Sequence, residues 1–248
     1  MQTARWEPLT REGRVLVTKE HGFGTDTILL ARFAAPRAGE RAAELGAGCG
    51  AASLLWCLSS GEVRVDAVEL QEKARGLLRR SVAENRLEER LAVHHADLRA
   101  LEGVLDAGRC DLVACNPPYQ PAGSGKASDD PARRMARHEE TCTLREIAQA
   151  AGRLLRFGGR FCLCQRPERL CDVLLALREA SLEPKRLRFV QQREGSAPNL
   201  FLAEGKKGAR PGLQLLPNLI IEDRAGGYTR EMEALYGSYR EAAECPEN

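Results

Sequence analysis

The sequence has few residues that would suit a metal centre and no stretch that would suit a membrane. It contains four histidines and no Cys-x-x-Cys pair, so the usual spacing of structural zinc ligands is missing and we expect no metal. No apolar run approaches the ~20 residues of a membrane helix. The first residues also lack the basic-then-apolar pattern of a signal peptide. These features predict a cytoplasmic protein that does not associate with membranes.

Net charge, length and cysteine content further limit the class of protein. The net charge of +2 is too small to indicate any class of partner. A chain of 248 residues with 43% hydrophobic residues fits one folded domain, and we assign residues 1–248 to it. The nine cysteines are odd in number and lie mostly in apolar runs such as Phe161–Cys164. Buried, reduced thiols are therefore expected.

Strand-like and helix-like segments alternate along the chain. Strands are predicted at 41–45, 64–70, 91–97, 111–115 and 160–165, with amphipathic helices between them. Two closely spaced strands, 186–191 and 199–204, predict a hairpin near the C-terminus. The pattern predicts an α/β, Rossmann-like sheet of seven strands, mostly parallel with an antiparallel C-terminal hairpin. Ligands of such sheets bind at the carboxyl ends of the strands.

The first strand leads into a glycine motif, Glu44-Leu-Gly-Ala-Gly-Cys-Gly50. Gly46, Gly48 and Gly50 permit a tight turn and a close approach of the backbone to a ligand. The spacing is Gly-x-Gly-x-Gly, whereas the dinucleotide fingerprint is Gly-x-Gly-x-x-Gly. S-adenosylmethionine (SAM) carries no pyrophosphate, and its cationic amino group would suit the acid Glu44. SAM is therefore the expected cofactor and S-adenosylhomocysteine the product, with a nicotinamide cofactor as the competing ligand.

Acidic residues mark the ends of the next two predicted strands. Glu69 stands where a carboxylate can accept hydrogen bonds from both ribose hydroxyls. Asp97 can accept from the adenine amino group of the cofactor. We include their neighbours Leu70 and Leu98 in the predicted cofactor site.

The fourth strand ends in Asn116-Pro-Pro-Tyr119, which predicts the catalytic loop. The lone pair of an aromatic amine is delocalised into the ring, so this nitrogen is a poor nucleophile. The Asn116 side-chain oxygen and the Pro117 carbonyl can each accept an N–H bond and favour a pyramidal nitrogen. Tyr119 offers a face on which a planar substrate can stack. Catalysis would then consist of positioning and electrostatic stabilisation for an in-line methyl transfer, without a metal.

Taken together, these motifs resemble a class I SAM-dependent methyltransferase of the amino-nitrogen branch. More narrowly, most of the chain resembles the bacterial tRNA(Val) adenine-37 N6-methyltransferase family, through stretches such as 22–31, 136–139, 205–208 and 217–223. The resemblance implies an enzyme that methylates the N6 amine of an adenine beside the anticodon of a tRNA. It also implies that Thr25 and Asp26, within a 1–40 N-terminal extension, border the SAM pocket.

Two segments carry basic residues that could bind RNA phosphates. The loop at 120–138, interpreted as a substrate lid, and the basic, glycine-rich loop at 205–212 supply the candidates Lys126, Arg133, Arg134, Arg137, His138, Lys206, Lys207 and Arg210. A solvated basic face is the alternative for each of them. RNA is the expected partner, and the resemblance implies tRNA; the oligomeric state is left open.

Two other functions remain possible at this stage. A protein glutamine N5-methyltransferase would also hold a planar nitrogen with Asn-Pro-Pro-Tyr, although such enzymes usually carry a helical N-terminal domain and only 43 residues precede Glu44 here. A non-catalytic RNA-binding module with a vestigial SAM pocket is the other alternative. The intact glycine, acidic and Asn-Pro-Pro-Tyr motifs argue against it.

Overall fold

The predicted strands form one mixed sheet in the computed structural model, which describes residues 3–117 and 142–237. Across the sheet the strands follow the order β10-β8-β9-β7-β6-β3-β4-β5, and β11 also pairs with β8. Five strands are parallel to one another: β3 (Arg41–Leu45), β4 (Arg64–Val68), β5 (Leu91–His94), β6 (Cys110–Cys115) and β7 (Leu155–Gln165). The Rossmann-like fold predicted from the sequence is confirmed.

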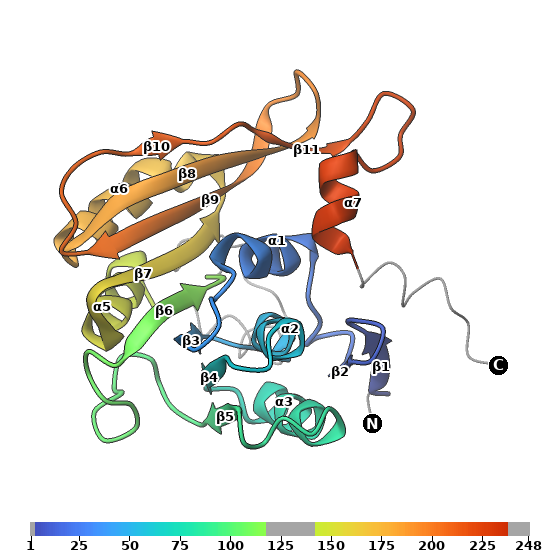
Figure 1. Cartoon of the computed structure of the whole chain (residues 1–248), viewed down its shortest axis with the longest axis vertical. Coiled ribbons are helices and arrows are strands. Elements are labelled where there is room, and N and C mark those ends of the chain that lie inside the picture. Colours follow the sequence, from blue (N-terminus) through green and yellow to red (C-terminus); the bar gives the residue numbers. More distant parts are fainter. Residues whose placement is uncertain (1–2, 118–141, 238–248) are drawn as a thin grey trace, which may run out of the picture.

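An antiparallel hairpin extends the sheet beyond β7 (Figure 1). Strand β9 (Pro198–Lys207) runs antiparallel to β7 and to β8 (Leu182–Arg193). Two short strands that the sequence pattern did not reveal, β10 (Gln214–Leu215) and β11 (Leu219–Glu222), lie parallel to β8. Among the described residues, the seven expected strands are thus joined by two more in the same sheet.

Helices cover both faces of the sheet (Figure 1). On one face α1 (Thr25–Ala34), α2 (Ala51–Ser59), α3 (Glu72–Glu84) and α7 (Arg230–Tyr236) pack over one apolar core. The opposite face carries α5 (Leu144–Leu154) and α6 (Leu170–Glu179), with the short turn η2 (Pro167–Arg169) before α6. None of the helices within the described ranges is long and apolar enough to cross a membrane.

The N-terminal segment packs into the core through Leu9, Val15 and Val17 and makes a polar contact with α3. A small hairpin, β1 (Arg5–Pro8) and β2 (Arg14–Val17), lies beside α3, where the Leu16 amide donates to Ser81 Oγ at 2.9 Å. Helix α1 then crosses the face of β7 and β9 and lies next to α2. The N-terminal segment thus becomes part of the same layer as the helices that follow the glycine motif.

Several predicted boundaries were wrong in detail. Strand β4 ends at Val68 and β5 at His94, so Glu69 and Asp97 lie in the loops that follow. Residues 205–207 belong to β9, because they pair with β7 and β8, and are not part of a loop. Of the cysteines described, six are buried as expected, Cys142 is half-buried and Cys171 is exposed. The predicted lid at 120–138 lies outside the described residues.

Candidate active site

The four segments singled out in the sequence meet at the carboxyl edge of the sheet. Leu45, the last residue of β3, pairs with Val68 of β4 on one side and with Cys115 of β6 on the other. Val68 in turn pairs with His94, the last residue of β5. Because these four strand ends are in register, the loops that follow them lie side by side.

The glycine loop after β3 needs all three of its glycines, for two different reasons. Gly46, Gly48 and Gly50 have φ angles of 70°, 57° and 84°, in the left-handed region that disfavours other residues. A side chain at Gly50 would also collide with Leu78 of α3, whose Cδ1 lies 2.1 Å from the position of a Cβ. Gly46 and Gly48 face open space instead. The backbone there is accessible to a ligand, as a cofactor loop requires.

Glu69 fastens this loop to the next one. Its buried carboxylate accepts hydrogen bonds from the backbone amide of Gly48 at 2.6 Å and from that of Gln71 at 2.7 Å. One bond goes to each oxygen, which leaves further lone pairs on both. The predicted contact with two ribose hydroxyls is compatible with this arrangement and stays a prediction.

Glu44 is buried beneath the first turn of α2. One carboxylate oxygen accepts from the backbone amide of Ser53, at 3.0 Å, and from the Ser53 hydroxyl. Burial raises the pKa of Glu44 to about 7 despite these two bonds. A carboxylate that is costly to ionise at neutral pH gains most from a cation beside it. The predicted contact of Glu44 with the amino group of SAM stays a prediction.

Asp97 lies in the turn after β5 and is engaged by Arg99. The Arg99 Nε donates to both carboxylate oxygens, at 2.9 and 3.0 Å, and this contact lowers the pKa of Asp97. Leu70 is 46% exposed at the same edge, whereas Leu98 is partly buried against the apolar core on the face of the sheet that carries α5 and α6. An exposed leucine between two acidic loops gives an apolar surface for a planar ring. The role of all three in cofactor binding stays a prediction.

Asn116 follows the last residue of β6 and is held from two sides. Its Nδ2 donates to Oγ1 of Thr27 in α1 at 3.2 Å, and its Oδ1 accepts from the Cys164 thiol of β7 at 3.0 Å. Pro117 is buried, and Tyr119 lies outside the described residues. The amide is therefore fixed in orientation at the point where α1, β6 and β7 meet.

Thr27 and Cys164 were not identified from the sequence. Thr27 stands two residues after the expected Thr25 and carries no motif of its own. Cys164 was interpreted only as a buried core thiol of an alternating strand, and its contact with Asn116 has no local signal because the two residues are 48 positions apart in the chain. The only available signal was that Thr27 and Cys164 lie near the ends of elements that reach the carboxyl edge of the sheet.

The expected Thr25 and Asp26 form the first turn of α1, next to this point. Asp26 Oδ1 accepts from the Thr27 amide at 2.8 Å. The Tyr236 hydroxyl of α7 donates to Thr25 Oγ1 at 2.7 Å, and the rings of Tyr228 and Tyr236 are 5.4 Å apart. The C-terminal helix thus supports the N-terminal end of α1, an interaction that no sequence motif indicated.

The basic candidates that the structure describes do not gather around Asn116. Lys206 and Lys207 lie at the end of β9 that pairs with the beginning of β7 and β8, at the opposite edge of the sheet. Lys207 Nζ donates to the carbonyls of Gly152 and Leu155, at 2.7 Å each. Other basic candidates fall in the segment that is not described; they are Lys126, Arg133, Arg134, Arg137 and His138.

Three comparisons place the chain among known proteins. The methyltransferase small domain family matches residues 10–178. A tRNA1(Val) (adenine(37)-N6)-methyltransferase from Porphyromonas gingivalis is 29% identical over 84% of each chain, and one from Shewanella sp. is 30% identical over 84% of this chain and 87% of its own. A predicted O-methyltransferase from Agrobacterium tumefaciens has the same fold, with a TM-score of 0.72 and 22% identity over 87% of this chain and 97% of its own. With the glycine loop and Asn116 placed at one edge of this sheet, the chain belongs to the methyltransferase small domain family.

Proposed function

We propose that this protein transfers a methyl group from SAM to the exocyclic N6 amine of an adenine in tRNA, next to the anticodon. The observation that carries the proposal is the fixed amide of Asn116 at the end of β6, adjacent to the glycine loop of β3. The names of the curated relatives from Porphyromonas gingivalis and Shewanella sp. favour adenine and tRNA over other amino substrates.

The residues on the cofactor side fit SAM. Glu44 offers a carboxylate whose raised pKa would fall beside an ammonium group, and Glu69 keeps lone pairs for hydroxyl groups. Gly46 and Gly48 leave the backbone open between them. When bound, SAM supplies a methyl group on a sulfonium, which is activated for displacement without help from a base or a metal.

The residues on the substrate side prepare the amine. An amide oxygen has two acceptor sites, and Asn116 Oδ1, which accepts from the Cys164 thiol, would also accept one N–H of the target. The carbonyl of Pro117 would accept the other. The two bonds localise the lone pair on nitrogen, the N–C bond forms as the C–S bond breaks, and the extra proton on nitrogen leaves to solvent afterwards. Bonds that strengthen along this path lower the barrier.

The proposal is tested by methyl transfer from tritium-labelled SAM into separate tRNA, ribosomal RNA and protein fractions. We expect label in tRNA, recovered as N6-methyladenosine on nucleoside analysis by mass spectrometry. The Asn116→Ala variant serves as the control for label that does not come from this site. Label recovered in glutamine of the protein fraction would overturn the proposal in favour of the glutamine methyltransferase alternative.

A further inference from the structure

A cavity of about 330 Å³ lies on the side of Asn116 away from the glycine loop. We call it the hairpin cavity, because residues of β8, β9 and β11 line it, together with the first turn of α1, Arg166 and Tyr228. Thr25 and Asp26 line it, and the next residue, Thr27, holds Asn116. In the sheet, β6 separates this cavity from the cofactor strands β3, β4 and β5.

The hairpin cavity is lined by both apolar and polar side chains. Val190, Leu200 and Ile221 are buried side chains of β8, β9 and β11 that form its floor. The exposed amides of Gln192 and Asn199 also line it, and the Gln192 Nε2 donates to Glu222 Oε1 at 2.6 Å. An apolar surface bordered by side-chain amides suits a heteroaromatic base, because amides both donate to and accept from the edges of a base.

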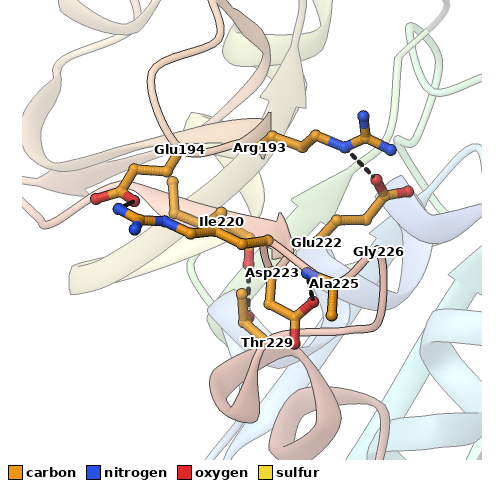
Figure 2. A pocket seen from close by; sticks show the side chains of 9 residues that line it. Arg193, Glu194, Ile220, Glu222, Asp223, Ala225, Gly226 and Thr229 are labelled. Carbon is orange, nitrogen blue, oxygen red and sulfur yellow. Dashed lines mark hydrogen bonds and ion pairs between the residues drawn. The ribbon is translucent and has the colours of Figure 1, made fainter.

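Phosphate is a poor match for the same cavity. Asp26 and Glu222 line it and would repel an anion, and Arg166, which also lines it, donates to the Asn199 carbonyl at 2.7 Å. The arginines near the hairpin tip are already neutralised: Figure 2 shows Arg193 paired with Glu222, at 2.8 Å, and Arg224 lies 3.2 Å from Glu194. A neighbouring hollow, which shares Glu222 with the hairpin cavity, is thus lined by ion pairs rather than by a basic patch.

We infer that the hairpin cavity binds a nucleobase that flanks the target adenine in the RNA strand. This inference rests on the proposed function and adds the part of the substrate that the enzyme holds besides the reacting base. Asn116 itself does not line the cavity, so the base bound there is a neighbour of the one that reacts. Holding that neighbour would fix the position of the target amine between Asn116 and the cofactor.

The test uses the full chain, a short anticodon stem-loop RNA containing an adenine target, and the variants Asn199→Ala and Gln192→Ala/Asn199→Ala. Loss of hydrogen bonds to a base should weaken RNA binding by about tenfold in the double variant. The KM for RNA should rise accordingly, with SAM affinity unchanged. The salt dependence of RNA binding should keep its wild-type slope, because no phosphate contact is lost. Gln214→Ala, an exposed glutamine of β10 paired beside Arg186, is the matched control.

Two results would overturn the inference. RNA affinity equal to wild type in a folded double variant would mean that nothing in the strand binds there. A flatter salt slope would mean that the cavity region contacts phosphate instead of a base. The affinity is measured by direct titration, so it can be read without turnover. A wild-type protein that binds RNA but methylates no adenine would contradict the proposed function alone.

Discussion

The side-chain amide of Asn116 donates to the hydroxyl of Thr27, 3.2 Å away, and so joins the end of β6 to the first turn of α1. The two residues are 89 positions apart in the chain. Thr27 and, from the other side, Cys164 together hold the amide in one position. The acceptor that a target amine requires is therefore oriented before any substrate arrives.

Thr27→Val should lower kcat because it removes this acceptor while keeping the shape of the side chain. We expect a fall of about 2- to 10-fold, which corresponds to one neutral hydrogen bond of about 0.5–1.5 kcal/mol. Thr27→Ser should restore the rate, and SAM affinity should change in neither variant. Single-turnover methylation and calorimetry measure the two quantities. Equal rates for the valine and serine variants would show that Thr27 does not position Asn116.

Asn116→Ala should abolish most turnover with nearly intact SAM affinity. The lost bond strengthens as the nitrogen becomes pyramidal, so the effect falls on kcat, by about 10²–10³ if it matches other preorganised polar groups. Asn116→Asp keeps an acceptor oxygen and should retain part of the activity. Quantification of N6-methyladenosine by mass spectrometry gives the rates. Wild-type turnover in the alanine variant would rule out the proposed mechanism.

Glu69→Ala should weaken SAM binding by roughly 1.5–3 kcal/mol, the range for hydrogen bonds to a charged group. The carboxylate also anchors the Gly48 amide, so part of the loss would come from a loosened loop. Glu69→Gln keeps one acceptor and should fall between wild type and alanine. Calorimetric titration measures the affinity for SAM. Unchanged affinity in a folded alanine variant would remove Glu69 from the proposed site.

The stability of the protein without SAM should depend on pH through the protonation of Glu44. Its folded pKa of about 7 lies above the ordinary 4.5, so the folded state holds the proton more tightly than the unfolded chain does. Stability should therefore fall as pH rises from about 4.5 to about 7, by about 3 kcal/mol in total, and then level off. Urea unfolding of wild type and Glu44→Gln across this range tests it; the glutamine variant should lose this part of the slope. SAM should bind more tightly as pH rises toward 7, because its ammonium needs the ionised carboxylate. Parallel pH profiles for the two proteins would contradict both expectations.

Lys206 and Arg210 provide a test of whether RNA reaches the far edge of the sheet. The candidate contact of these residues with phosphate stays a proposal, and it would lie away from Asn116. Replacing both by alanine should therefore raise KM for tRNA and flatten its salt dependence, without changing kcat. Lys207 is left intact because it binds two carbonyls at the end of α5 and the start of β7. An unaltered salt slope would mean that these side chains are only solvated.

The glycine loop and the acids at the strand ends were predictable because their signals are local. Gly46, Gly48 and Gly50 reveal a turn by their own backbone requirements, and β-strand periodicity before each acid locates the strand ends to within a few residues. The precise ends were not predictable: β7 begins at Leu155 because it pairs with Cys110, across a stretch whose Gly158 and Gly159 conceal the strand pattern.

Contacts between distant segments left no trace in the sequence. Tyr236 and Thr25 are 211 positions apart and meet only because α7 packs on α1. Lys207 falls in a basic, glycine-rich stretch that predicts a loop. Its bonds to Gly152 and Leu155 form only because β9 is paired in the sheet, and this pairing has no local signal. Short strands such as β10 form by joining an existing edge and have too few residues to show a period.

The order of the strands has a consequence for how such enzymes diversify. Most of the proposed cofactor residues come from β3, β4 and β5 and their loops, whereas the hairpin cavity is built mainly from β8, β9 and β11, which follow one another between residues 182 and 222. Mutations in that later stretch can reshape what is recognised while the methyl-donor loops stay untouched. The proposed methyl-donor loops and the proposed base-binding cavity can thus be altered separately by substitution.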